Sequence, residues 1–566
     1  MFYTKDGTAY CRNCCQRSAV LLFIILCCYG LGFSQAPTTY VITFSDKKNS
    51  SYDTAFPEAF LSLRAIEKRQ RLNIPITERD LPINDTYINL LKNFSSIEII
   101  TQSKWLNYIV VTCDNQLVLE TIKYLPFVSQ VKKTHEIDYS HFDIRFSNRE
   151  YNYPKNISTQ HDTNGLAYYG LAAKQIAVHS GQYLHQQGYQ GEGMLIVMLD
   201  NGYNSLDTLT LFNSFRENRR LVGIYDAAQG EPTALYRAGD HGTKVLSVMA
   251  LNEPYHFVGT APYADYFLIR TEMDTYEDIL EEYFWVAGAE MADSIGADVV
   301  NSSLGYTYFN NEEQNHSFDD LDGRHSVASI AASILSQNGC IVCVAAGNEG
   351  EKEWHYISIP SDAPDALCVA AMSTDSTIAG FSSRGSKSFT YTKPDVTSVG
   401  FQAAYCTMGD TIDRGNGTSL ATPVCAGLCA CLWQAFPDKS SLEIMEAIRQ
   451  SAHIYEHKDT LFGNGIPNFQ KAYKMLLESG IETIDHRSLF KIYPNPTNDI
   501  LNISCLSDNA QFYQLQIYDI RGSIVKTHSF HTSQAWIDVT DFSQGIYFVK
   551  CITDDNQVDI LKFVKY

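Results

Sequence analysis

Basic and charged residues are scarce in this chain. Lys and Arg total 43 against 64 Asp and Glu, so the formal net charge is −21, and only 19% of the 566 residues are charged. Proteins that bind nucleic acid or anionic membrane surfaces present positive patches, so this balance argues against both classes of partner. Because 45% of the residues are hydrophobic, general disorder is excluded too. The composition fits a soluble protein exported into an open environment.

Cysteine pairs at metal-binding spacing are also largely missing. Five of the 15 cysteines lie within Cys11–Cys28, and among the others only Cys340 and Cys343 are spaced like metal ligands. Those two lie in an apolar strand, where residues three apart point to opposite faces, so they cannot easily share a metal or a disulfide. Cys425 and Cys429, one helical turn apart among small and apolar residues, indicate tight core packing. Cysteine usage therefore does not identify the compartment.

The apolar run Ser18–Phe33 is short for a membrane helix, which needs about 20 residues. Two arginines precede it and small residues follow it, which is typical of a secretory signal peptide. We expect a signal peptide over residues 1–34, with cleavage after Ser34, and no membrane span in the mature chain. A membrane anchor is one alternative. A lipoprotein is another, although Leu26 before Cys27 is larger than such processing prefers.

A chain of 566 residues is too long for one core, so two to four domains are expected. Residues 35–150 combine strand-like ends with a helical middle and predict a small α+β unit. Its expected strands and helices are, in order, Tyr40–Phe44, Ala59–Asn73, Asp85–Asn93, Tyr108–Thr112, Leu117–Leu125 and Val128–Val131. The polar segment 151–167 reads as a linker where cleavage could occur.

Residues 168–480 change to an alternation of apolar strands and helical stretches. Strands are expected at 194–200, 264–270, 297–301 and 339–345, and helices at 242–251, 275–294, 324–338 and 419–436. Continuously apolar strands that alternate with helices indicate an α/β domain with a parallel sheet covered on both faces. Ligand sites of such sheets lie at the carboxyl ends of the strands.

Three polar residues in this domain suit nucleophilic catalysis. Ser419 lies in Gly417–Pro423 (Gly-Thr-Ser-Leu-Ala-Thr-Pro), between a small-residue turn and an apolar helix. There, free backbone N–H groups and the helix dipole favour a developing anion. A serine becomes a good nucleophile when a histidine takes its proton and a carboxylate orients that histidine. His241 opens a helical run, and Asp200 ends an apolar strand. A plain helix cap is the alternative for Ser419.

A fourth segment, Cys340–Gly350, predicts a buried strand that runs into a Gly-rich turn around Asn348. An Asn in such a Gly-rich turn, here Gly347-Asn348-Glu349-Gly350, is ordinarily a left-handed turn residue. An amide at a strand end can also stabilise an oxyanion, and its position between His and Ser in the chain favours that role.

These segments resemble the subtilisin-like serine proteases, or subtilases. Asp200-Asn201-Gly202 resembles the aspartate motif, His241-Gly242-Thr243 the histidine motif and Gly417–Pro423 the serine motif. The resemblance implies a catalytic triad of Asp200, His241 and Ser419, with Asn348 as the oxyanion residue. Asn201 departs from the family, which usually has Ser or Thr there; that position does no proton chemistry.

The resemblance also implies a substrate cleft lined by Ser303, Leu304 and Gly305, where an extended peptide can pair with an exposed edge. Tyr306 follows where subtilisins tend to have glycine, which suggests a narrower pocket. The chemistry requires no cofactor and no metal. The segment Phe318–Gly323 has three carboxylates and a glycine, so a structural calcium ion is conceivable there, but a solvated helix-entry loop is the simpler interpretation.

The tail, residues 484–566, has short alternating runs separated by Gly, Asn and Asp and predicts a β-sandwich. Its Tyr493–Pro496 opening (Tyr-Pro-Asn-Pro), its Gly545–Lys550 strand and its lysine-flanked last strand resemble the C-terminal sorting domain of type IX secretion cargo in Bacteroidetes-type bacteria. A generic sandwich that binds carbohydrate or protein is the alternative.

Together these patterns predict a secreted or surface-attached serine endopeptidase. The α+β unit of residues 35–150 precedes the protease domain, and in this position it resembles a subtilase pro-region, which acts as a chaperone and inhibitor. An ordinary binding domain is the alternative. The expected partners are protein or peptide substrates, the chain's own pro-region and the type IX secretion machinery. A catalytically silent adhesin or binding protein on the same scaffold is the rival hypothesis, but it would need a broken triad, and none is visible.

Overall fold

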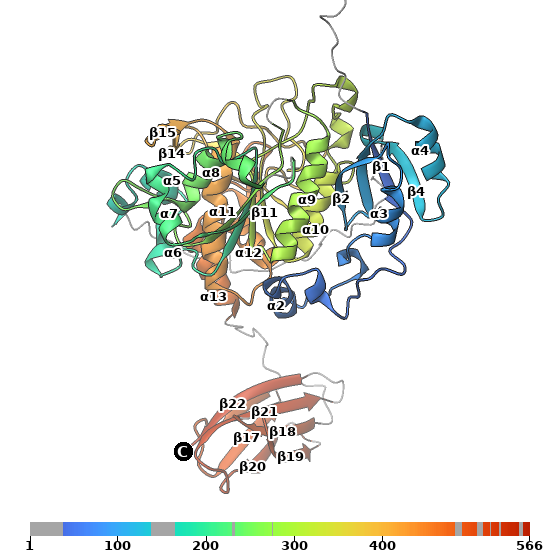
Figure 1. Cartoon of the computed structure of the whole chain (residues 1–566). Coiled ribbons are helices and arrows are strands. Elements are labelled where there is room, and N and C mark those ends of the chain that lie inside the picture. Colours follow the sequence, from blue (N-terminus) through green and yellow to red (C-terminus); the bar gives the residue numbers. More distant parts are fainter. Residues whose placement is uncertain are drawn as a thin grey trace, which may run out of the picture. The chain divides into compact units, whose positions relative to one another are not determined.

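The computed structural model describes residues 38–136, 165–228, 232–273, 276–480 and, in the tail, 490–505, 513–520, 522–530, 532, 534–553 and 558–566. The chain divides into two compact units at Leu476 and Leu477 (Figure 1). The expected signal peptide, most of the expected linker 151–167 and the expected start of the tail at residue 484 lie outside the described residues.

A seven-stranded parallel sheet forms the centre of the first unit. Its strand order is β13-β12-β11-β10-β5-β9-β6. The strands are β5 (Leu195–Asp200), β6 (Leu221–Asp226), β9 (Asp265–Arg270), β10 (Val299–Ser302), β11 (Ile341–Ala345), β12 (Leu367–Met372) and β13 (Val396–Val399). β5, β10 and β11 are buried along their whole length, because helices cover both faces. The predicted α/β class is confirmed.

Alternate residues of each strand pack into different cores. Ile196 and Met198 of β5 join one cluster, and Leu195 and Val197 join the other. The first face is covered by α8 (His241–Ala250), α11 (Thr418–Ala435), α12 (Ser441–Ser451) and α13 (Phe469–Gly480), and the second by α9 (Leu280–Ile295) and α10 (Val327–Gln337). Cys340 and Cys343 lie on opposite faces, as predicted.

Shorter elements complete this unit. They are the helices α5 (Ala173–Ala177), α6 (Gln182–Gln186) and α7 (Asn213–Glu217) and two small antiparallel pairs, β7 (Asn252–Glu253) with β8 (Phe257–Val258) and β14 (Ala403–Cys406) with β15 (Ile412–Gly415). Helix α11 has the length and composition of a membrane span, but it is buried in the protein core with the sulfur atoms of Cys425 and Cys429 4.0 Å apart. It is a core helix of the folded domain.

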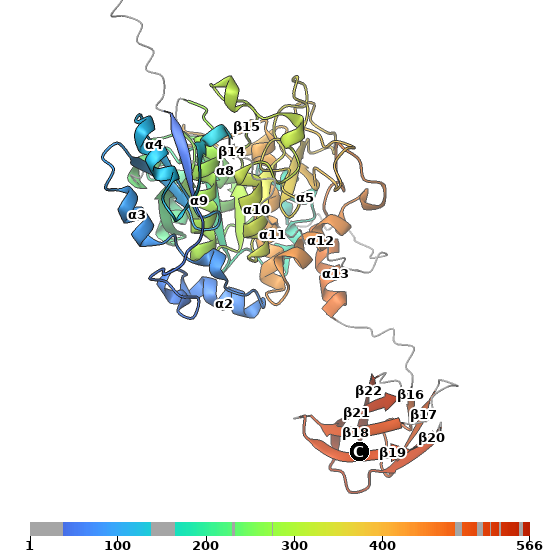
Figure 2. The ribbon, with the colours of Figure 1, turned by 90° about the vertical axis from the view of Figure 1, so that its right-hand side faces the viewer.

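The N-terminal α+β region belongs to the same unit and packs beside α9. Its antiparallel sheet has the order β2-β3-β1-β4. The strands are β1 (Thr39–Phe44), β2 (Glu98–Ser103), β3 (Tyr108–Thr112) and β4 (Val128–Lys133), and the helices are α2 (Leu63–Arg71), α3 (Asp85–Leu91) and α4 (Gln116–Lys123). Figures 1 and 2 both place this region against α9.

Buried polar contacts fix the N-terminal region to α9. Glu290 of α9 accepts hydrogen bonds from the Ser103 hydroxyl (2.6 Å) and from the backbone N–H groups of Lys104 (3.0 Å) and Trp105 (2.9 Å). The Arg69 guanidinium of α2 contacts Asp293 of α9 at 2.8 Å, and Arg69, Asp293 and Glu290 are all buried. Breaking one partner of such a pair leaves a buried charge uncompensated, so the region is held in a defined position on α9.

The tail is a β-sandwich. One antiparallel sheet has the order β16-β17-β20 and the other β19-β18-β21-β22, and residues of both sheets, such as Leu501 and Val549, share one core. The strands are β16 (Phe490–Tyr493), β17 (Ile500–Cys505), β18 (Tyr513–Asp519), β19 (Ile524–Phe530), β20 (Gln534–Asp538), β21 (Gly545–Thr553) and β22 (Val558–Lys565). The predicted sandwich is confirmed.

Candidate active site

Three of the predicted site segments meet at one edge of the parallel sheet. Strand β10 lies between β5 and β11, and all three run parallel. Asp200 ends β5, Ser303 follows β10 and Asn348 follows β11. Parallel register therefore brings these residues to the carboxyl edge, where ligand sites of such sheets form.

Asp200 and His241 form a hydrogen-bonded pair. His241 Nδ1 lies 2.7 Å from Asp200 Oδ1, and the carboxylate, whose side chain is 0% exposed, also accepts the Asn201 N–H at 2.8 Å. His241 is the first residue of α8 and its side chain is 32% exposed, so the ring can meet a ligand from outside. This arrangement holds the imidazole with Nδ1 toward the carboxylate, so Nε2 is available to accept a proton from a group outside the pair.

The charge of Asp200 changes the basicity of His241. Burial lowers the pKa of His241, but the neighbouring Asp200 charge and the hydrogen bond to it outweigh that effect, so the pKa lies above its ordinary value. A ring with a raised pKa is a better proton acceptor, and the Asp200 carboxylate stabilises the imidazolium once it forms.

Close packing at Gly242 sets the distance between α8 and the Asp200 segment. A Cβ at Gly242 would lie 2.4 Å from the carbonyl oxygen of Gly202 and 3.0 Å from Asp200 Cβ. Any larger residue would push the start of α8, and His241 with it, away from the carboxylate. The glycine after the histidine is therefore a steric requirement of the pair.

Ser419 is the second residue of α11, and its side chain is half-buried. Pro423 lies inside the first turns of the helix and has no N–H, so it cannot donate to the Ser419 carbonyl four residues earlier. The hydroxyl of Ser303 donates to that carbonyl instead, at 2.9 Å, and itself accepts from Asn301 Nδ2 at 3.0 Å. The contact ties the residue after β10 to the first turn of the apolar helix.

Asn348 contacts the residue before Ser419. Its side-chain oxygen accepts from the Thr418 N–H (2.9 Å) and the Thr418 hydroxyl (3.1 Å), which directs the NH₂ group of the amide away from α11. Asn348 itself is exposed and is not the left-handed residue of the turn; Gly347, with φ 104°, takes that conformation. The simple turn-residue alternative for Asn348 is therefore wrong. Thr418, which holds the amide oxygen, was not singled out from the sequence, although it adjoins Ser419 in the motif.

The predicted substrate segment is only partly open. Ser303 is buried, Leu304 is half-buried and Gly305 is exposed. Tyr306 is 2% exposed, and its hydroxyl donates to Glu272 Oε1 at 2.7 Å. Its ring is therefore buried in a core cluster and does not line an open pocket, so the suggestion that it narrows such a pocket was wrong.

The acidic segment Phe318–Gly323 uses its carboxylates locally. Asp320 accepts from the N–H (2.6 Å) and hydroxyl (3.0 Å) of Ser317, and Asp322 accepts from the N–H groups of Arg324 (2.8 Å) and His325 (3.0 Å). These bonds cap the short helical turn and shape the chain before α10, as a helix-entry loop does.

Comparison with known proteins assigns three regions of the chain to known families. Residues 39–149 match the peptidase S8 propeptide domain of Bacteroidota, 135–465 match the subtilase family and 491–565 match the secretion system C-terminal sorting domain. The chain is 27% identical to subtilisin E of Bacillus subtilis (strain 168) over 292 residues, which are 51% of this chain and 68% of that protein.

Other relatives give the same result. Identity is 26% to subtilisin of Bacillus pumilus, over 51% of this chain and 94% of that protein. It is also 26% to the thermostable alkaline protease of Halalkalibacterium halodurans, over 51% and 70%. The N-terminal region is thus a propeptide domain, and the tail is a type IX sorting domain that directs secretion and attachment to the cell surface. The chain belongs to the subtilase family and is a secreted serine protease.

Proposed function

We propose that the protein is an endopeptidase that hydrolyses peptide bonds with a triad of Ser419, His241 and Asp200. The observation that carries the proposal is the 2.7 Å bond between His241 Nδ1 and the buried Asp200 carboxylate. A histidine oriented in this way is the general base that a serine nucleophile needs. The Asp…His…Ser order in the chain is the order of the subtilase family, to which the chain belongs.

In this mechanism the Ser419 hydroxyl attacks the scissile carbonyl carbon while His241 Nε2 takes its proton. The tetrahedral intermediate collapses to an acyl-enzyme when His241 returns the proton to the leaving amine. Water then attacks the acyl group with His241 again as base, which releases the carboxylic acid and restores Ser419. All groups come from the protein, so the chemistry needs no cofactor.

Asn348 is proposed to stabilise the oxyanion together with the Ser419 backbone N–H. Because Thr418 holds the side-chain oxygen, the NH₂ group is the part of the amide left to donate. Ser303, Leu304 and Gly305 are proposed to form one wall of the substrate cleft, with the backbone of exposed Gly305 available to an extended peptide.

Asn348→Ala is expected to lower kcat by roughly 10²–10³ and to leave KM nearly unchanged, because the lost donor acts on the transition state. Steady-state kinetics on a chromogenic peptide measures both constants. Asn218→Ala, which removes an exposed amide whose bonds run to Ser214, is the matched control and should leave both constants unchanged. A kcat within a few-fold of the parent value would remove Asn348 from the mechanism.

The propeptide domain is proposed to inhibit the enzyme until the enzyme itself cuts it away. Full-length chain carrying Ser419→Ala, made in a protease-free system, is therefore expected to keep its N-terminal region, whereas the parent chain loses it. Mass spectrometry of the intact products measures this. A trace of mature parent enzyme should then trim the variant, which shows that its cleavage site is accessible. Efficient trimming of the variant alone would mean that another protease activates the chain.

The decisive test of the proposed function is covalent labelling with a fluorophosphonate, which an activated serine hydroxyl attacks with loss of fluoride. The folded parent enzyme should take up one label on Ser419, located by peptide mapping, and the Ser419→Ala chain none. A catalytically silent adhesin on this scaffold would leave both chains unlabelled.

A further inference from the structure

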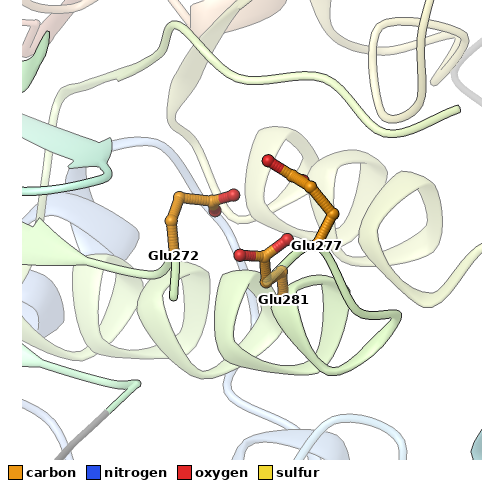
Figure 3. Close-up of side chains that lie close together, drawn as sticks. All are labelled: Glu272, Glu277 and Glu281. Atoms are coloured by element: carbon orange, nitrogen blue, oxygen red, sulfur yellow. The ribbon is translucent and has the colours of Figure 1, made fainter. Parts of the chain in front are cut away.

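Three glutamates converge between the end of β9 and the start of α9. Glu272 follows the strand, Glu277 precedes the helix and Glu281 is the second residue of the helix. One carboxylate oxygen of each lies within 4.8 Å of the others. Figure 3 shows the three side chains directed into one common space.

The Glu281 carboxylate is buried and half unsatisfied. Glu281 is only 1% exposed to solvent. Oε1 accepts the Met273 N–H at 2.8 Å, the buried Oε2 accepts no hydrogen bond from the described residues, and the carboxyl group lies within hydrogen-bond reach of the Glu277 carboxylate. An orphaned carboxylate oxygen in the interior is costly, so this atom points to a ligand that the chain alone does not provide.

The surroundings offer the cluster little positive charge. Glu272 and Glu281 are both buried, and each carboxyl group lies in the electric field of the other. The nearby His316 is bonded to Glu282, and the start of α9 supplies only the partial charge of a helix end. A bound cation would supply the positive charge that balances the three carboxylates.

We propose that Glu272, Glu277 and Glu281 bind a divalent cation, and that the ion is calcium. Calcium takes oxygen ligands at about 2.3–2.6 Å, so two oxygens on one ion lie at most about 4.6–5.2 Å apart, which accommodates the observed spacing. Magnesium, with bonds of about 2.0–2.1 Å, demands a near-octahedral shell and keeps several of its waters, so it is seldom held by a set of protein carboxylates alone. Exposed Glu277 opens the cluster to solvent, so water can complete the coordination shell.

The site is coupled to the proposed substrate wall. Glu272 Oε1 accepts from the Tyr306 hydroxyl (2.7 Å) and the Thr271 hydroxyl (2.9 Å). Tyr306 directly follows Gly305, and its backbone pairs with Ile359 in both directions. An ion that fixes Glu272 therefore also fixes the side chain of the residue that directly follows Ser303–Gly305. The millimolar calcium of an extracellular medium suits the weak affinity of extracellular calcium modules, roughly 10⁻⁴–10⁻³ M.

The test uses the full-length chain with Ser419→Ala to prevent self-digestion, freed of metal with a chelator. Terbium(III), which prefers the same oxygen ligands, is added, and its emission is excited through nearby aromatic rings such as Tyr306. Emission that calcium displaces is expected in this parent. Glu281→Gln should abolish that component, and exposed Glu277→Gln should weaken calcium competition by about tenfold or more. Calcium should raise the Tm of the parent and have less effect on either variant.

Glu312→Gln is the matched control, since Glu312 is exposed and lies outside the cluster, and it should behave like the parent. Should Glu281→Gln fail to fold, Glu277→Gln decides the question, because its side chain is at the surface. Parent-like terbium and calcium binding in Glu277→Gln and Glu281→Gln, or no calcium-displaced emission in the parent, would overturn the proposal. Because no readout uses hydrolysis, the result is independent of the proposed triad.

Discussion

Ser419→Ala is expected to reduce kcat for peptide hydrolysis on the order of 10⁶-fold. The activity that remains, roughly 10³–10⁴ times the uncatalysed rate in water, comes from substrate binding and oxyanion stabilisation alone. The hydroxyl is the only atom group removed, and the serine's backbone contacts stay in place. The carbonyl of residue 419 still accepts from Ser303, and the Thr418–Asn348 contact is unaffected. KM is therefore expected to change little, and kinetics on a chromogenic peptide measures the loss.

The matched control for this substitution is Ser303→Ala. It also removes one hydroxyl near the helix start, but that hydroxyl holds the Ser419 carbonyl and does no chemistry. We expect Ser303→Ala to keep fluorophosphonate labelling and to lose far less activity than Ser419→Ala. Turnover close to the parent value in Ser419→Ala would exclude Ser419 as the nucleophile.

The elements that carry the site could be predicted from the sequence because their patterns are local. Strands expected at 194–200 and 339–345 are observed as Leu195–Asp200 and Ile341–Ala345, since uninterrupted apolar runs are typical of buried parallel strands. The helix expected at 242–251 is observed at His241–Ala250. Because the strands are parallel, the residues that follow them lie together at one edge of the sheet.

Other strands were missed for physical reasons. Leu367–Met372 is fully buried, but no helix of the described chain separates it from β11, so the strand–helix alternation did not reveal it. Leu221–Asp226 is an edge strand of mixed exposure, and Glu98–Ser103 of the propeptide domain is largely polar and lies at the edge of its sheet. Edge strands lack the continuous apolar signal of central ones.

Long-range polar contacts could not be predicted either. Arg69 and Asp293 are 224 residues apart, and nothing in either segment indicates the other. The convergence of Glu272, Glu277 and Glu281 depends on where β9 ends and where α9 begins, since the helix expected from residue 275 starts at Leu280. Element boundaries are the least certain part of a sequence-based prediction, and this cluster lies on one.

Removal of the tail, residues 484–566, is expected to leave hydrolysis intact and to abolish release of the enzyme from the cell. The tail is a separate compact unit with its own core, around Leu501 and Phe563, and it contributes none of the proposed catalytic residues. It is also the sorting domain, so the truncated chain should enter the periplasm through its signal and go no further. Activity in the culture medium is compared with activity released by osmotic shock.

The complementary variant attaches residues 484–566 to an unrelated, signal-bearing reporter, which should then leave the cell, while the reporter without them stays in the periplasm. A sandwich that bound substrate instead would give the reverse pattern, with normal secretion and weaker hydrolysis of large or insoluble substrates. Undiminished activity in the medium after the deletion would contradict a requirement for the tail in export. The core of the sandwich is built from tail residues alone, so the deletion removes no core residue of the protease unit. If the enzyme released by osmotic shock is active, misfolding of the protease unit cannot explain why the enzyme stays in the periplasm.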